Sequence, residues 1–204
     1  QQFPEQGGAA TMDPGVLRRW LTSKMMTRMS SEPAQNRARV KAERRRQKFG
    51  SPHTIEYFHQ VDDGYSHLAV QLLAKIQVRY NVELRCHLVS ESLGANLPEP
   101  QLLSKLSCYD ANQIASHYGL EAPKKLNNNS ETTASPLCIA QAESILAGFS
   151  NEDFITHGAT VNAALWRDDH KGLQQLSQQF GEATKEQTAE AIQAGNDRRA
   201  QLKH

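Results

Sequence analysis

The chain has few cysteines, and no two of them have the spacing of a redox or metal-binding motif. Its 204 residues include three cysteines, Cys86, Cys108 and Cys138, which lie far apart in the sequence. This spacing excludes a CxxC redox motif and a zinc knuckle. A sparse, odd count is not typical of a disulfide framework and favours a reducing compartment. We therefore expect a cytoplasmic protein whose thiols are buried and unreactive.

The chain also lacks long apolar runs and a strong net charge. No stretch is long and apolar enough to span a membrane, and no secretory apolar segment follows a charged start. The net charge is +1 at pH 7, and hydrophobic residues make up 38% of the chain. Such a composition gives no general signal for nucleic acid or membrane, and it is sufficient for one sizeable core.

Basic residues are concentrated in residues 17–48, which carry a charge of about +9 against a mildly acidic remainder. Within residues 17–29, apolar side chains recur at helical spacing, and arginine and lysine are expected on the opposite face. The apolar set is Leu17, Trp20, Leu21, Met25 and Met29. The favoured interpretation is a helix that packs on its own domain. A weak contact with an anionic membrane surface through residues 17–48 remains an alternative.

The segments on either side of this helix carry little information about the fold. Residues 1–16 are rich in glycine, proline and glutamine, so we expect a disordered or non-native extension. Residues 37–48 predict a solvated helical linker. Binding of nucleic acid is not favoured, because no aromatic residues alternate with the basic ones. Residues 17–52 thus form a basic helical arm and linker that ends at Gly50-Ser51-Pro52.

From His53 the pattern predicts a strand–helix–strand unit over residues 53–101. The segment His53–Val61 is rich in β-branched and aromatic residues with alternating character, which predicts a strand. A turn with a helix N-cap signal follows at residues 62–64, and Tyr65–Tyr80 has leucines at helical spacing. A second strand is predicted over Val82–Val89. Because a helix joins the two strands, we expect them to be parallel with a right-handed crossover.

The remaining segment, residues 102–204, shows helical patterns and no convincing strand, with a polar loop over residues 127–133. Helices are predicted over residues 102–118, 136–149, 152–166, 171–180 and 185–202. Two parallel strands are too few for a stable sheet. We therefore expect further strands, either from chain that continues after His204 or from a partner such as a second copy in a homodimer. The first source is favoured.

The run Ile55–Ala69 resembles the first strand and helix start of DsbA-like proteins of the thioredoxin superfamily. It is most similar to the branch that holds 2-hydroxychromene-2-carboxylate isomerase and the kappa-class glutathione transferases. The Ser-Pro-Tyr-Ser signature of that branch matches Asp63-Gly64-Tyr65-Ser66 here, and Tyr109–Leu120 and Val161–Asp169 resemble later helices. The resemblance covers residues 53–204. It implies an α/β fold with a thioredoxin-like βαβ core and an inserted α-helical subdomain. The C-terminal part of that fold, including a cis-proline loop, would lie beyond His204.

The resemblance implies a thiol- or glutathione-linked oxidoreductase or isomerase that acts on a small thiol or aromatic substrate, with glutathione as cofactor and no metal. It assigns Asp63 and Ser66 as catalytic residues and Gly64 and Tyr65 as glutathione-binding residues. Asp63 stands where the family has a reactive serine or cysteine. A carboxylate there would repel a thiolate and raise its pKa. The favoured alternative for Asp63 is a plain helix N-cap.

Two further residues are assigned to the substrate pocket by the same resemblance, His59 at its edge and Trp166 in its cleft. The structural alternative for both is a packed core side chain, and it is favoured. His67 is not expected to serve Ser66 as a base, because adjacent residues on a helix point about 100° apart. The other histidines show no metal-ligand spacing.

Three hypotheses about function follow. The first is an enzyme of the DsbA-like superfamily with an atypical acidic active-site turn. The second is a catalytically inactive thioredoxin-fold binding module, in which Asp63 has replaced the reactive residue. The third is a peripheral membrane or scaffold protein that functions through its basic N-terminal arm.

Overall fold

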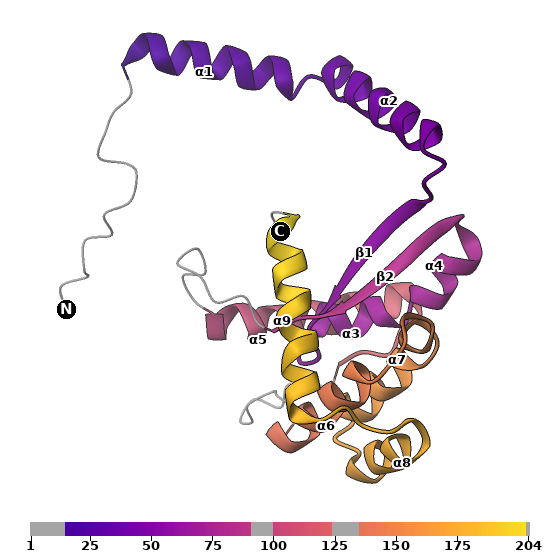
Figure 1. Cartoon of the computed structure of the whole chain (residues 1–204). Helices are drawn as coiled ribbons and strands as arrows, with labels where there is room; N and C mark the ends of the chain where they lie inside the picture. The colour runs from indigo at the N-terminus through magenta and orange to yellow at the C-terminus, as the bar shows by residue number, and fades with distance from the viewer. Residues whose placement is uncertain (1–14, 91–99, 124–134, 203–204) are drawn as a thin grey trace, which may run out of the picture. The chain divides into compact units, whose positions relative to one another are not determined.

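The computed structural model describes residues 15–90, 100–123 and 135–202, and the predictions for residues 1–14 and for the loop at 127–133 lie outside them. Contacts divide the chain into two compact units, residues 1–52 and residues 53–204. The second unit is a mixed α/β structure that is mostly helical (Figure 1). Each unit is described by itself.

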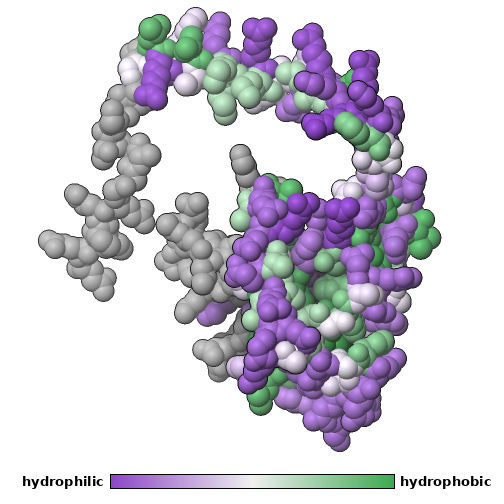
Figure 2. Space-filling model, in the orientation of Figure 1, coloured by the Kyte–Doolittle hydropathy of each residue, from purple (hydrophilic) through white to green (hydrophobic). Residues whose placement is uncertain are grey.

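The first unit contains the two predicted helices, α1 at Val16–Met29 and α2 at Glu32–Lys48. The expected separation of apolar and basic faces in α1 is wrong. The Lys24 ammonium lies 5.3 Å from the centre of the Trp20 ring. Since residues seven apart share a helix face, Lys24 also lies on the side of Leu17. Figure 2 shows hydrophobic and hydrophilic residues interspersed along these helices.

The second unit is built on a two-stranded parallel sheet, as the sequence predicts. Strand β1 spans His53–His59 and strand β2 spans Val82–Leu88, with His53 opposite Val82 and His59 opposite Leu88. The described residues include no third strand. The two strands place their carboxyl ends side by side, next to the start of the first helix of this unit.

The helix predicted over residues 65–80 is broken into two, α3 at Gly64–Val70 and α4 at Leu73–Arg79. The break coincides with Gln71. Its side-chain amide donates to the carbonyl of His67 at 2.9 Å and to the carbonyl of Glu121 at 3.0 Å, and it accepts from the Glu121 N–H at 2.9 Å. The Gln71 side chain thus bonds a carbonyl of α3 and also binds the backbone of Glu121, which is distant in the sequence.

Within the described residues, five more helices and one short 3-10 turn follow, close to the predicted bounds. They are α5 at Pro100–Ala115, η1 at Ser116–Tyr118, α6 at Pro136–Ala147, α7 at Asn151–Trp166, α8 at His170–Phe180 and α9 at Lys185–Gln201. Side-chain oxygens of Ser135, Ser150, Asp169 and Thr184 cap the starts of α6 to α9. None of the described helices has an apolar stretch long enough to cross a membrane.

One hydrophobic core joins the sheet to the helices. Leu84 and Leu88 of β2 pack with Ile145 of α6 and with Phe154 and Leu165 of α7. Helix α9 packs against β2 (Figure 1). It is also tied to β1, because Arg198 donates to the Glu56 carboxylate, which also bonds His87 at 2.6 Å. The Arg198 bond and the His87 bond lower the pKa of Glu56 to about 2.

Candidate functional site

The start of α3 carries four of the predicted site residues, Asp63 as the helix N-cap and Gly64, Tyr65 and Ser66 in the first turn, and we call these four residues the α3 turn. The Asp63 carboxylate accepts from the Ser66 N–H at 2.8 Å. The Ser66 hydroxyl in turn lies 3.4 Å from the N–H of Gln60. The cap uses a free N–H group of the first turn, which is where the resemblance would place a thiolate.

Helix α5 covers this turn directly. The Ser107 hydroxyl donates to Asp63 Oδ1 at 2.5 Å, and the Tyr65 hydroxyl donates to Asp110 Oδ2 at 2.5 Å. Gly64 is buried between these two bonds. A Cβ atom there would lie only 3.0 Å from the Cα of Cys108, so α5 approaches this closely only because residue 64 is a glycine.

The thiols of β2 and α5 are poor nucleophiles in this environment. Burial and the negative charge of Asp63 raise the pKa of Cys108, the thiol of α5 beside the turn. Burial raises the pKa of Cys86 to about 12, although this side chain is half-buried rather than fully buried as predicted. Since the thiolate is the reactive form, neither side chain favours disulfide exchange.

A chain of buried polar side chains lies beneath the same turn. His59 Nδ1 is 2.7 Å from the Tyr57 hydroxyl, and His59 Nε2 is 3.1 Å from Asn162 Nδ2. Asn162 Oδ1 is 2.8 Å from His67 Nδ1. His59, His67 and Asn162 have no exposed surface. We call Tyr57, His59, Asn162 and His67 the buried relay.

The side-chain amide of Asn162 sets the direction of the relay. Its NH₂ donates to His59 Nε2 and to the Val61 carbonyl at 3.2 Å, so His59 is neutral and carries its proton on Nδ1. His59 then donates to the Tyr57 oxygen, and Tyr57 donates to the Ser66 carbonyl at 3.1 Å. The relay therefore ends on the backbone of the α3 turn.

At its other end the relay stops at two nitrogen atoms without partners. His67 Nε2 and Trp166 Nε1 are buried and make no hydrogen bond. The two rings are neighbours, with centres 5.6 Å apart. Burial lowers the pKa of His67, outweighing the opposite effects of the Asn162 bond and the Glu121 charge. A buried nitrogen without a hydrogen-bond partner costs folding free energy, so this end of the relay lowers the stability of the native protein.

Burial also makes His59 a source of acid instability. Burial, with a smaller contribution from His67, lowers the pKa of His59 from 6.5 to about 3. Between these values the unfolded chain binds a proton at His59 and the native protein does not, so native stability falls as pH falls from 6.5 towards 3. We expect His59 to contribute a loss of about 2 kcal/mol between pH 8 and pH 5. Urea denaturation across this range measures it.

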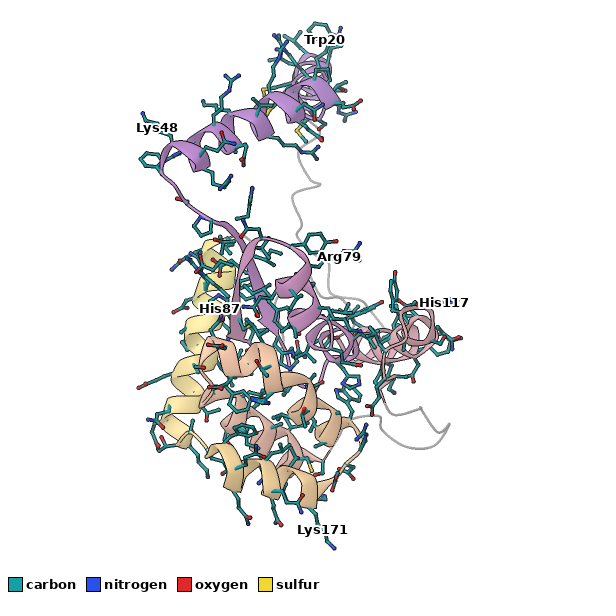
Figure 3. The ribbon with its side chains drawn as sticks, turned by 90° about the vertical axis from the view of Figure 1, so that its right-hand side faces the viewer. Trp20, Lys48, Arg79, His87, His117 and Lys171 are labelled. Carbon is teal, nitrogen blue, oxygen red and sulfur yellow. The ribbon has the colours of Figure 1, made fainter. Side chains whose placement is uncertain are left out.

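The matched variants for this measurement are His59→Gln and His117→Gln. Glutamine keeps hydrogen-bonding groups but does not titrate, so His59→Gln should flatten the pH dependence. His117 lies exposed on η1 (Figure 3), and its replacement should leave the pH dependence unchanged. Equal slopes in all three proteins would contradict a neutral, buried His59.

A separate cavity of about 480 Å³ lies between α7 and α8. Polar side chains are prominent in its lining, and they comprise Gln71, Glu121, Thr160, Arg167, Asp169, Gln175 and Gln179. Arg167 and Glu121 face each other as a two-bond ion pair, with distances of 2.7 and 2.5 Å. The volume lies within the range of small-molecule sites, about 300–1,000 Å³.

The structure brings some of the predicted residues together and separates others. Asp63, Gly64, Tyr65 and Ser66 share the α3 turn, and His59 lies below it through Tyr57. Trp166 is buried against His67 and does not line the α7–α8 cavity. Sequence reasoning missed Tyr57, His67 and Asn162. The sequence pattern hints at them only in that each is a polar residue within a strand or helix that otherwise has apolar residues on its buried face.

Comparison with protein-family models, with curated proteins and with solved structures finds no match to this chain. The resemblance to DsbA-like proteins therefore stays a prediction.

Proposed function

We propose that residues 53–204 act as a DsbA-like binding module for a small zwitterionic, amide-rich molecule, with no thiol chemistry at the α3 turn. Glutathione is the representative of this ligand class. One observation carries the proposal: the Asp63 carboxylate and helix α5 together occupy the start of α3, where the resemblance would place a thiolate or the sulfur of glutathione.

The electrostatics of the turn support a non-redox role. A negative charge beside the helix start disfavours a thiolate there, and Cys108, which lies against the turn, already has a raised pKa. The Ser66 N–H, which would stabilise a bound anion, is bonded to Asp63 at 2.8 Å. A ligand at this position would have to displace both the carboxylate and α5.

The α7–α8 cavity offers a better chemical match to the proposed ligand. Arg167 donates two of its five guanidinium N–H groups to Glu121. The remaining N–H groups can bind the carboxylate of a ligand. The amides of Gln175 and Gln179 can pair with peptide groups. Asp169 and Glu121 can accept from an ammonium. Glutathione contains all three kinds of group.

Two other functions remain predictions with weaker support. A glutathione-using enzyme with an acidic turn requires the α3 turn to open, and a membrane or scaffold role requires the basic arm. In α1, Lys24 sits among the apolar side chains, which weakens the case for a helix that lies on a membrane surface.

Calorimetric titration of the full chain with glutathione tests the proposal. We expect micromolar to low-millimolar binding by the native protein, lost in Arg167→Gln because the carboxylate partner is removed. The control Lys171→Gln makes the same charge change on the exposed side of α8, where Lys171 points away from the protein (Figure 3), and should bind normally. Asp63→Ser keeps an N-cap and should also bind normally.

Other outcomes overturn the proposal in distinguishable ways. Binding lost in Tyr65→Phe and Ser66→Ala, but kept in Arg167→Gln, would place the ligand at the α3 turn and support the enzyme. Binding by Asp63→Ser alone would mean that the carboxylate has disabled that turn. No binding by any variant would remove glutathione and its chemical class.

A further inference from the structure

A cysteine, an aspartate and a histidine from different elements meet near the starts of α6 and α8. Cys138 lies in the first turn of α6, Asp168 in the turn after α7, and His170 at the first position of α8. One ligand atom from each lies within 4.8 Å of the other two. The Cys138 sulfur is 3.7 Å from His170 Nε2, which is 3.9 Å from Asp168 Oδ1.

These three donors form a set that suits zinc and related divalent transition metals. Thiolate, imidazole and carboxylate bind Zn²⁺ at about 2.3, 2.0 and 2.1 Å. In a tetrahedral site those lengths put neighbouring donor atoms about 3.4–3.6 Å apart. The separations of 3.7 and 3.9 Å exceed this range by a few tenths of an ångström, and the Cys138 and Asp168 donors lie within 4.8 Å, so side-chain rotations have to close the site around an ion.

The burial of the three residues also fits a metal site with an open position. Cys138 has no exposed surface, its backbone N–H donates to the Ser135 hydroxyl at 3.2 Å, and its sulfur lies 3.2 Å from His170 Nδ1. The side chains of His170 and Asp168 are 54% and 39% exposed. An ion therefore has a route from solvent, and its fourth position can be taken by water.

The backbone at Asp168 places its side chain at the end of α7. Asp168 has φ of 56°, and it is the one non-glycine residue with positive φ among those described. It occupies the left-handed position that ends α7, where its N–H bonds the Leu165 carbonyl at 3.0 Å and the next N–H bonds Ala164 at 2.9 Å. Glycine is the usual residue there. Aspartate tolerates this conformation better than most other residues, although at some cost relative to glycine.

We propose that Cys138, Asp168 and His170 bind one divalent transition metal ion of the zinc type, with a water in the fourth position. Binding requires the Cys138 thiol to release its proton to solvent, since the thiolate is the ligand. None of the three residues lines the α7–α8 cavity, although Asp168 lies between its lining residues Arg167 and Asp169 in the chain. The test below uses the metal ion alone, so its outcome does not depend on the proposed glutathione binding.

Cobalt(II) titration of the reduced, full-length protein is the test, because a thiolate ligand gives cobalt a near-ultraviolet charge-transfer absorption. We expect one Co²⁺ per chain, displaced by Zn²⁺. The absorption should disappear in Cys138→Ser, and His170→Ala should weaken Co²⁺ binding about tenfold or more. Cys86→Ser removes a thiol from β2 and should bind as the native protein does.

Substitution of Asp168 separates a ligand from a residue with a purely structural role. Asp168→Gly removes the backbone strain, so the melting temperature of the metal-free protein should rise while Co²⁺ affinity falls about tenfold or more. Asp168→Asn keeps a residue that tolerates this backbone and should also lose affinity. Unchanged absorption in Cys138→Ser, full affinity in His170→Ala and Asp168→Gly, or no Co²⁺ binding by the native protein would overturn the proposal.

Discussion

Asn162→Leu should lower the free energy of unfolding by about 3–5 kcal/mol, because it removes the centre of the buried relay. The asparagine side chain bonds His59 Nε2, His67 Nδ1 and the Val61 carbonyl, and it has no exposed surface. Leucine has similar volume but no polar atoms. It would leave His59 Nε2, His67 Nδ1 and the Val61 carbonyl without the bonds that Asn162 supplies, close to two buried nitrogens that already lack partners.

Urea denaturation at pH 8 measures this loss, because both histidines are neutral there. The control Thr160→Ala changes an exposed position on the same helix and should stay within about 0.5 kcal/mol of the native protein. A cost below about 1 kcal/mol for Asn162→Leu would contradict a relay that the protein needs for folding. The loss should also shift the α3 turn, since Tyr57 passes the relay to the Ser66 carbonyl.

Gly195→Ala should destabilise the protein by about 3 kcal/mol or more, against the direction of helix propensity. A Cβ atom at Gly195 would lie 1.9 Å from the Leu88 carbonyl oxygen and 3.2 Å from Val89 Cγ1. Helix α9 packs against β2 at this point, so it would have to move away from the sheet. In an unobstructed helix the same change would stabilise by about 1 kcal/mol.

The matched control is Ala194→Gly, at the neighbouring exposed position of α9. It should cost about 1 kcal/mol, the ordinary helix penalty for glycine. Chemical denaturation of both variants separates the cost of the steric clash between α9 and β2 from the ordinary helix propensity of glycine and alanine. A Gly195→Ala protein as stable as the native one would mean that α9 does not approach β2 as closely as described.

Each of these effects arises from a pair of segments that the sequence does not link. His59 and Asn162 are 103 residues apart, and Cys138 and His170 are 32 apart. No local sequence pattern predicts either contact. The prediction that Cys138 would be buried was right, but its neighbour could not be inferred. The prediction that no histidine had metal-ligand spacing considered distance along the chain and not distance in space.

The sequence by itself determined the local elements of this protein. The two parallel strands, the extents of the later helices and the Asp63 cap follow from periodicity and short-range hydrogen bonding, which act over a few residues. Only the tertiary structure decided that α5 covers the α3 turn, that Gln71 breaks the predicted helix, and that the relay and the Cys138–Asp168–His170 cluster form. These depend on which faces pack together, and packing is set by the whole core at once.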